Sequence, residues 1–131
     1  MHKFQIWLAE DNDSFVYLLN RGLQMSGVPA HVHVFTDGSA PLSTQAPPPD
    51  LLILDLNLSG TSGLDILETL RGQPHLQNTR AVVLTGSTLP PNQERLQALG
   101  VERYLIKPSD LNGLLKVCEV LKTILQDRNG A

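Results

Sequence analysis

The sequence predicts an α/β fold, a doubly wound parallel five-stranded sheet with helices on both faces. Two observations support this prediction. Apolar strand-like runs alternate with amphipathic helical stretches along the 131 residues, which is typical of strands joined by right-handed helical crossovers. The run at 51–54 is apolar throughout, as expected for a parallel strand that is covered on both faces.

The first two strands and the helix between them follow from local patterns. Phe4 to Ala9 forms the first buried strand, and Asp13 or Ser14 caps the helix after it, which stops at Gly27. Val32 to Phe35 is the second strand, and its alternation with histidines indicates a position near an edge of the sheet.

The remaining strands and helices are assigned in the same way. The third strand ends at Asp55, the fourth is Ala81 to Thr85 and the fifth is Val101 to Ile106. Capping residues and prolines then predict the helices. These are a short helix and a stiff linker within Asp37 to Pro49, a helix from Leu64 to Arg71, a helix opened by Pro90 and Pro91 and ended by Gly100, and a last helix capped by Ser109 with an apolar stripe from Leu111 to Leu125.

Composition excludes several classes of protein. With 41% hydrophobic and 18% charged residues, the chain is an ordinary globule rather than a disordered or membrane-spanning protein. A net charge of −3 and scattered Lys and Arg residues argue against a nucleic-acid partner. No stretch approaches the roughly 20 apolar residues of a membrane span. Without a signal-peptide pattern, and with the single Cys118 unable to form an internal disulfide, we expect a cytoplasmic protein.

Charged and polar side chains stand at the ends of four predicted strands. Glu10 and Asp11 follow the first strand, Asp55 ends the third, Thr85 ends the fourth and Lys107 follows the fifth. Because the carboxyl ends of parallel strands share one edge of the sheet, where such folds bind ligands, we expect these groups to converge. Crowded carboxylates repel one another unless a cation lies between them, and Mg²⁺ takes carboxylate and water ligands. The sequence therefore predicts a magnesium site at this edge.

Asp55 is the expected reactive group of this edge. A strand this apolar rarely ends in an acid without a reason. Its carboxylate would attack a phosphoryl donor and form an acyl phosphate. Lys107 would act as a compact point charge on one phosphoryl oxygen, and the Thr85 hydroxyl would donate to another. Taken alone, the segment from Glu10 to Asp13 is equally consistent with a solvated, helix-capping loop.

Other residues that could carry chemistry are interpreted as structural. Trp7 lies in the middle of a strand and belongs to the core, and Cys118 is a helix-core residue rather than a nucleophile. His31 and His33 lack a third ligand within reach of the sequence pattern, so no zinc site is predicted.

The chain resembles the response-regulator receiver domains. The matching pieces are Glu10-Asp11, the apolar run ending in Asp55, Gly63 in the loop beyond it, Val83-Leu84-Thr85, and Tyr104-Leu105-Ile106-Lys107-Pro108. The resemblance implies a (βα)₅, flavodoxin-like sheet with strand order 2-1-3-4-5. It also implies that residues 1–131 form a single receiver domain, with a core of about 3–127 and no effector domain.

The resemblance assigns the phosphoacceptor and the metal ligands. Asp55 would accept a phosphoryl group from a sensor histidine kinase or a histidine phosphotransfer protein. Glu10, Asp11, Asp55 and the backbone carbonyl of Asn57 would bind Mg²⁺. The domain would not be an enzyme with a separate substrate, because it would catalyse only its own phosphorylation and dephosphorylation.

The resemblance also implies a conformational switch. Thr85 and Lys107 would sense the phosphoryl group, and Tyr104 would turn inward when Thr85 moves towards it. A cis peptide bond before Pro108 would aim the lysine inward. The signal would appear as a change at the fourth helix, the fifth strand and the fifth helix.

Two features suggest partners. The stretches Gly72 to Thr79 and Leu84 to Ser87 are similar to lone regulators paired with bacterial phytochromes, which would make a bacteriophytochrome the kinase. On the last helix Val117, Val120 and Ile124 widen the apolar arc beyond the usual width for a surface helix. We expect this flank to join a homodimer or partner interface, the alternative being extra packing against a neighbouring loop.

Three other classes of protein share part of this sequence pattern. A haloacid-dehalogenase-type phosphatase also uses an aspartate at a strand end, but it needs a second aspartate two residues on, where this chain has Asn57. A flavodoxin-like flavin carrier is disfavoured by the acidic first loop. A pseudo-receiver that binds proteins without being phosphorylated is the nearer alternative, and the five residues of the strand ends argue against it.

Overall fold

The strands form one parallel sheet with the predicted topology. The computed structural model describes residues 3–36, 47–58, 60–86 and 92–127. Its five-stranded sheet has the order β2-β1-β3-β6-β7, with every pair parallel. The strands are β1 (Phe4–Ala9), β2 (Ala30–Phe35), β3 (Leu51–Asp55), β6 (Ala81–Thr85) and β7 (Val101–Ile106). Numbered along the chain this is 2-1-3-4-5, so the predicted order is confirmed, and β2 lies at an edge as predicted.

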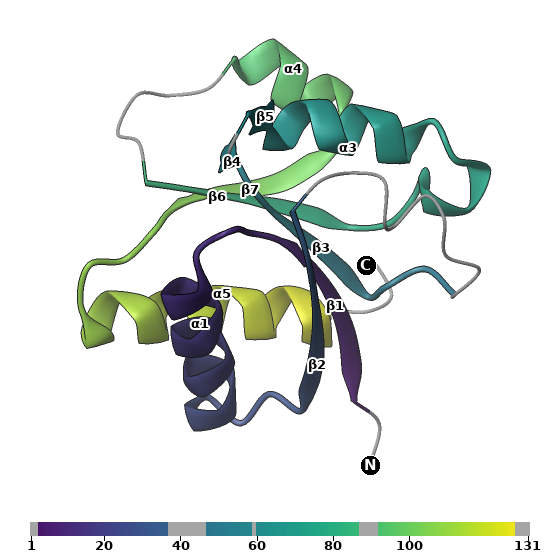
Figure 1. The fold of residues 1–131 in the computed structure, drawn as a ribbon. Coiled ribbons are helices and arrows are strands. Elements are labelled where there is room, and N and C mark those ends of the chain that lie inside the picture. The colour runs from purple at the N-terminus through teal and green to yellow at the C-terminus, as the bar shows by residue number, and fades with distance from the viewer. Residues whose placement is uncertain (1–2, 37–46, 59, 87–91, 128–131) are drawn as a thin grey trace.

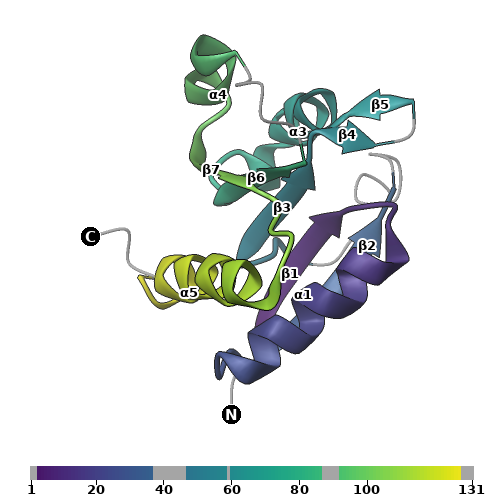
Figure 2. The same cartoon turned by 90° about the vertical axis from the view of Figure 1, so that its left-hand side faces the viewer.

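The helices cover both faces of the sheet. α1 (Asp13–Met25) and α5 (Leu111–Gln126) lie on one face, and α3 (Gly63–Arg71) and α4 (Gln93–Ala98) lie on the other (Figures 1 and 2). A 3₁₀ turn, η1 (Pro74–Leu76), follows α3, and the short strands β4 (Asn57–Leu58) and β5 (Thr61–Ser62) pair after β3. The prolines at 90 and 91 and the segment 37–46, part of the expected helix and linker, lie outside the described residues.

Burial on both faces explains the apolar run of β3, in which every residue from Leu51 to Asp55 is buried. One cluster of buried side chains joins the sheet to α1 and α5, and another joins it to α3. Trp7 and Cys118 belong to these two clusters, as the sequence predicts. Burial raises the pKa of the Cys118 thiol to about 11, so it is a structural rather than a nucleophilic cysteine.

The helix caps lie one or two residues away from their predicted positions. The Asn12 side chain accepts a hydrogen bond from the backbone N–H of Phe15 at 3.0 Å, and it caps α1 in place of Asp13 or Ser14. Asp110 accepts from the Gly113 N–H at 2.7 Å and caps α5 in place of Ser109. Neighbouring Asn, Asp and Ser residues are all competent caps, so sequence alone does not select among them.

A glycine lets α1 and α5 pack closely. A Cβ atom at Gly22 would lie 2.7 Å from Cys118 Sγ and 3.1 Å from Leu114 Cγ. Because only hydrogen fits between these helices, their axes can approach more closely than a larger residue would allow. α1 begins after Glu10 and Asp11, and α5 begins after Lys107, so this contact fixes two sides of the strand-end site relative to each other.

The flank of α5 that was expected to form an interface is part of the monomer core. Val117 is 8% exposed and Ile124 is 7% exposed, and both pack among the buried residues of the α1–α5 face. Val120 is partly buried against the same cluster. The expected role in an interface is therefore wrong for Val117 and Ile124, because the sheet and α1 together cover a wider arc of α5 than a surface helix usually buries.

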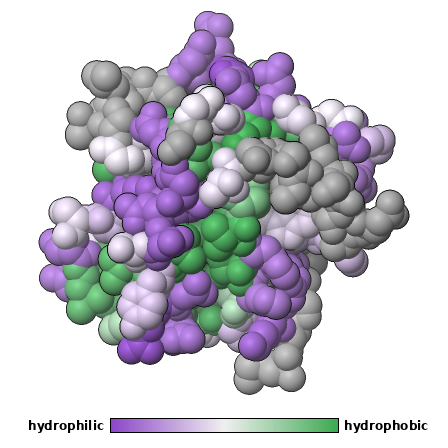
Figure 3. All heavy atoms as spheres, in the orientation of Figure 1, coloured by the Kyte–Doolittle hydropathy of each residue, from purple (hydrophilic) through white to green (hydrophobic). Residues whose placement is uncertain are grey.

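The surface carries apolar groups outside this core. Hydrophobic side chains gather near the middle of the face shown in Figure 3, between α1 and the α3 layer, and hydrophilic side chains surround them. Elsewhere the exposed large apolar residues include Tyr17, Leu18 and Met25 of α1. Within the described ranges no helix combines the length and apolar character needed to cross a bilayer.

Candidate functional site

The five predicted strand-end residues meet at the carboxyl edge of the sheet. Asp55 and Thr85 end the neighbouring strands β3 and β6. The sheet ladder also continues one residue past two strands. Glu10 donates its N–H to the Phe35 carbonyl at 3.0 Å, and Lys107 donates its N–H to the Thr85 carbonyl at 2.7 Å. Backbone hydrogen bonds thus fix the places from which these side chains project.

Three carboxylates form the centre of the site. One oxygen each of Glu10, Asp11 and Asp55 lies within 4.8 Å of the others, the one group of three or more potential ligand residues found in the described part of the chain. Glu10 is 1% exposed and Asp55 is 4% exposed, whereas Asp11 faces solvent. Oxygen donors at this spacing, open to water on one side, suit a hard divalent cation that keeps part of its hydration shell.

Lys107 is the positive charge of the site. Its Nζ donates to Glu10 Oε1 at 2.7 Å, to Glu10 Oε2 at 2.9 Å and to Asp55 Oδ2 at 3.0 Å. Burial lowers the pKa of Lys107, but its hydrogen bonds and ion pairs with the two acids outweigh burial and leave that pKa raised. The side chain therefore carries a full charge against the two buried carboxylates.

Glu10 has a pKa above the ordinary value for a glutamate. Burial raises the pKa of Glu10 to about 7, and Lys107, which favours the ionised form, does not cancel the combined effect of burial and the nearby Asp55. The single ammonium of Lys107 therefore does not bring the pKa of Glu10 back to its ordinary value. A second cation would favour the ionised form of Glu10, because an opposite charge nearby lowers the pKa of an acid.

Asp55 is oriented at both of its oxygens. Oδ2 accepts from Lys107, and Oδ1 accepts from the backbone N–H of Asn57 at 3.1 Å. The Asn57 side chain in turn donates to Thr85 Oγ1 at 3.4 Å, which links the two strand ends. The sequence pattern gave no sign of this second contact, because it depends on how the loop after β3 folds back.

Gly63 allows the backbone to pass directly behind Asp55. Its N–H donates to the Leu56 carbonyl at 3.2 Å, and a Cβ atom at this position would collide with the carbonyl oxygen of Asp55. Only glycine permits this approach. Gly63, one of the residues on which the resemblance to receiver domains rests, therefore has a steric role beside Asp55.

The predictions for Tyr104 and Pro108 compare differently with the structure. Tyr104 is half-buried and packs with Leu64, Val83 and Leu96 between the sheet and α4, and its role as a switch stays a prediction. Among the described residues no peptide bond is cis, so the cis bond expected before Pro108 is absent. Lys107 reaches both buried carboxylates without it.

The sequence did not identify Phe15 as part of the site. Lys107 Nζ lies 4.7 Å from the centroid of the Phe15 ring, and Phe15 is a buried residue in the first turn of α1. In the sequence Phe15 is one of several apolar residues on the inner face of a helix. No spacing rule separates a core phenylalanine from one that contacts a cation.

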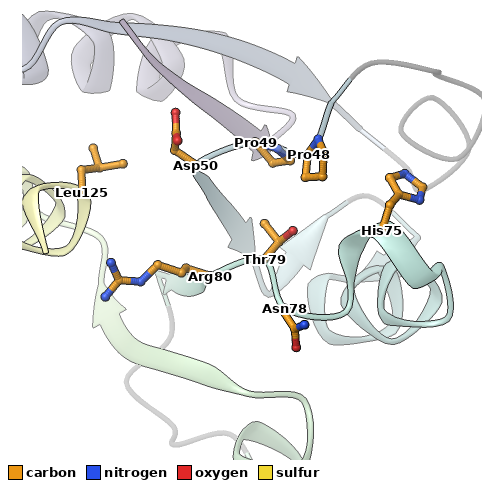
Figure 4. Close-up of a pocket in the computed structure, with 8 residues that line it drawn as sticks. All are labelled: Pro48, Pro49, Asp50, His75, Asn78, Thr79, Arg80 and Leu125. Carbon is orange, nitrogen blue, oxygen red and sulfur yellow. The ribbon is translucent and has the colours of Figure 1, made fainter. Parts of the chain in front are cut away.

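A surface pocket lies at the opposite edge of the sheet, where the strands begin (Figure 4). Its lining residues are Pro48, Pro49, Asp50, His75, Asn78, Thr79, Arg80 and Leu125. Here the cation is already engaged in the structure. Arg80 pairs with Glu102 at 2.5 Å and donates to the carbonyls of Ile124 and Asp127. These contacts of Arg80 tie the start of β6 to β7 and to the end of α5.

Relatives among characterised proteins were found over most of the chain. It is 32% identical over 109 residues to the acid tolerance regulatory protein ActR of Rhizobium meliloti, covering 82% of this chain and 54% of ActR. It is 28% identical over 126 residues to response regulator Rcp1 of Synechocystis, covering 90% of this chain and 86% of Rcp1. The chain spans about half the length of several curated relatives that it matches.

Solved structures agree with these relatives. The phosphorylated cyanobacterial phytochrome response regulator RcpA matches with a TM-score of 0.80 and 27% identity, over 95% of both chains. The Mn²⁺-bound form of Rcp1 matches with a TM-score of 0.76 and 27% identity, over 92% of both chains. The response regulator receiver domain family matches residues 6–119, nearly the whole sheet and its helices. On this evidence the chain belongs to the family of response regulator receiver domains.

Proposed function

We propose that the protein is a response regulator of a two-component phosphorelay in which Asp55 accepts a phosphoryl group. The observation that carries this proposal is the ammonium of Lys107, shared between Glu10 and Asp55 within a group of three carboxylates. A buried acid beside a mobile point charge, at a site suited to a cation, has what phosphoryl transfer requires. The donor is a sensor histidine kinase or a histidine phosphotransfer protein.

In the proposed reaction a carboxylate oxygen of Asp55 attacks the phosphorus of a phosphohistidine. The new O–P bond forms as the P–N bond to imidazole breaks, and the imidazole nitrogen keeps the electron pair and takes up a proton. Asn57 N–H and Lys107 orient the two Asp55 oxygens beforehand. After transfer, Lys107 and the Thr85 hydroxyl each meet a phosphoryl oxygen. Water later hydrolyses the acyl phosphate, so the domain catalyses only its own phosphorylation and dephosphorylation.

The carboxylate oxygens of the site fit Mg²⁺. Glu10, Asp11 and Asp55 would hold the ion, with the backbone carbonyl of Asn57 as a further ligand. When bound, Mg²⁺ would screen the negative charge of the site and hold a phosphoryl oxygen. The raised pKa of Glu10 is consistent with this assignment: burial is its main cause, the neighbouring Asp55 adds to it, and a bound cation would favour the ionised form that burial disfavours.

The proposed output is a conformational change at α4, β7 and α5. Thr85 is buried at the end of β6, and its hydroxyl would leave the Asn57 amide to reach the phosphoryl group. Tyr104 would then turn inward from the cluster that it shares with Val83 and Leu96. A change at one strand end would in this way reach the surface of α4 and β7.

Partners are proposed from the relatives. RcpA is a phytochrome response regulator, so a bacteriophytochrome is the proposed kinase, acting in the cytoplasm, with no nucleic acid or membrane as partner. A homodimer through α4, β7 and α5 belongs to the same proposal. Ile106 is 49% exposed and Leu111 is 55% exposed beside this region. Light scattering should show that Ile106→Glu self-associates less than the wild type. If the wild type and the variant are both monomeric, the proposed dimer is rejected.

The central experiment is intact-mass analysis after treatment with acetyl phosphate, with and without Mg²⁺. One metal-dependent phosphoryl adduct is expected on the wild type and none on Asp55→Asn. Asp65→Asn is a matched control, because Asp65 is an exposed acid on α3 that pairs with Arg95. An unmodified wild type that binds Mg²⁺ would instead support the pseudo-receiver that acts only as a binding module.

A further inference from the structure

Lys107 has two kinds of partner in the site. Three hydrogen bonds join its Nζ to Glu10 and Asp55, and the same atom lies 4.7 Å from the centroid of the Phe15 ring. The Phe15 side chain is 8% exposed and Lys107 is 19% exposed. At this distance and burial the ring face attracts the ammonium by a cation–π interaction.

We propose that Phe15 is a positioning residue for Lys107, a role that rests on the proposed function. Lys107 must turn from the carboxylate oxygens towards a phosphoryl oxygen when Asp55 is modified. Its hydrogen bonds to the acids are directional, so this movement breaks or redirects them. The attraction to the ring requires the ammonium to lie over the ring face, but it does not require any one N–H bond to point in a fixed direction. Phe15 therefore keeps the ammonium inside the site while its hydrogen-bond partners change.

Phe15 is held by its own surroundings rather than by the lysine. Its backbone N–H donates to the Asn12 side chain in the cap of α1. Its ring packs in the cluster that includes Leu19 and Leu114, on helices that meet closely at Gly22. A ring fixed in this way can serve as a stationary surface for a side chain that moves.

A surface hollow beside the ring makes substitutions practicable. The hollow has a volume of about 210 Å³ and is lined by Phe15, Leu18, Pro108, Ser109, Asp110, Leu111 and Leu114. Because the ring borders this space, tyrosine can direct its hydroxyl into it, and leucine leaves no sealed cavity. Both variants are therefore expected to fold.

The test compares Phe15→Leu, which removes the π face, with Phe15→Tyr, which keeps it. Phe35→Leu is the control, because Phe35 is equally buried at 8% exposure but belongs to the cluster on the α3 face. The first readout is the NMR shift of the Lys107 ε-methylene protons, which a ring face moves upfield. This signal should move downfield in Phe15→Leu and stay near its wild-type position in Phe15→Tyr and Phe35→Leu.

The second readout is the rate of phosphorylation by acetyl phosphate in Mg²⁺. It should fall about threefold to tenfold in Phe15→Leu and recover in Phe15→Tyr, the range that a partly desolvated cation–π contact supplies. Replacing Phe15 with 4-fluoro- and then pentafluorophenylalanine should lower the rate stepwise, because fluorine weakens the negative face of the ring with little change of shape.

The outcomes separate this inference from the proposed function. A Lys107 signal that does not respond to Phe15→Leu, or an equal loss of rate in Phe15→Leu and Phe15→Tyr, would overturn the positioning role. If the wild type took up no phosphoryl group, the proposed function would fail. The NMR signal would still show whether the ring holds the ammonium.

Discussion

The two edges of the sheet use positive charge in different ways. At the carboxyl edge one ammonium, that of Lys107, serves Glu10 and Asp55, with Asp11 close by. At the amino edge the guanidinium of Arg71 donates to four backbone carbonyls, those of Leu76, Gln77, Thr79 and Leu99. The first edge gathers three carboxylates around one ammonium, and the second joins one guanidinium to neutral backbone carbonyls.

This difference separates a site for a ligand from a structural joint. Crowded buried acids destabilise a fold unless a bound cation compensates them. An arginine that donates to several backbone carbonyls ties chain ends together and serves a structural purpose. A cluster of carboxylates around one ammonium, rather than the number of charged residues, marks the carboxyl edge as the functional one.

Replacing Lys107 of the carboxyl edge and Arg71 of the amino edge by methionine should give the largest contrast. Lys107→Met removes a charge from the reacting oxygens, so the phosphorylation rate should fall about 100-fold. Arg71→Met leaves carbonyls without their donor, so the free energy of unfolding should fall by about 3 kcal/mol with no change in the rate of the folded protein. Denaturant titration and intact-mass kinetics check both. A comparable loss of rate in folded Arg71→Met would remove the distinction between the edges.

A methyl group at Gly63 tests how tightly the carboxyl edge is built. Gly63→Ala would force its Cβ against the Asp55 carbonyl, and the free energy of unfolding should fall by roughly 3 kcal/mol. Gly86→Ala is the control, because a Cβ there meets no atom of the described residues within 4 Å. Thermal or denaturant unfolding of both variants measures the difference, and equal stability would show that the loop behind Asp55 yields easily.

The pH dependence of stability should report the burial of Glu10 at the carboxyl edge. Folding raises the pKa of Glu10 from 4.5 to about 7, mainly through burial. The stability contributed by protonated Glu10 is therefore fully present below pH 4.5 and lost as pH rises through about 7. With a chelator present to remove divalent metal ions, the free energy of unfolding should fall by on the order of 2 kcal/mol as the pH rises from 4.5 to about 7. Glu10→Gln should flatten this fall, and an unchanged slope in that variant would assign it to another group.

The smallest effect is expected where the two helices meet, away from the site. Gly22→Ala adds a methyl group 2.7 Å from Cys118 Sγ, and the clash should exceed the gain in helix propensity by about 1 kcal/mol. The double variant with Cys118→Ala should recover most of this loss. A double-mutant cycle in denaturant measures the coupling, and additive effects would show that the two positions do not interact.

Sequence predicted the elements and the strand ends because both depend on short-range patterns. The apolar run before Asp55 and the rule that parallel strands share a carboxyl edge were enough to bring Glu10, Thr85 and Lys107 together. The caps differed by one or two residues, since adjacent polar residues compete on nearly equal terms.

The remaining features depend on distances that no local pattern encodes. The contact of Phe15 with Lys107 arises only when α1 and the end of β7 meet in space. The burial of Val117 and Ile124 depends on how far the sheet extends beneath α5. Sequence periodicity gave the width of the apolar arc, but it did not show what covers that arc.

The contact between Gly22 and Cys118 also has an evolutionary consequence. Because the space between α1 and α5 is filled by the sulfur on one side and a hydrogen on the other, volume gained at position 22 has to be surrendered at position 118. Among homologous sequences the two positions should therefore covary in size, with alanine or serine at 22 accompanied by a smaller residue at 118. The sequences of α1 and α5 would then change together, while the relative positions of Glu10, Asp55 and Lys107 stay the same.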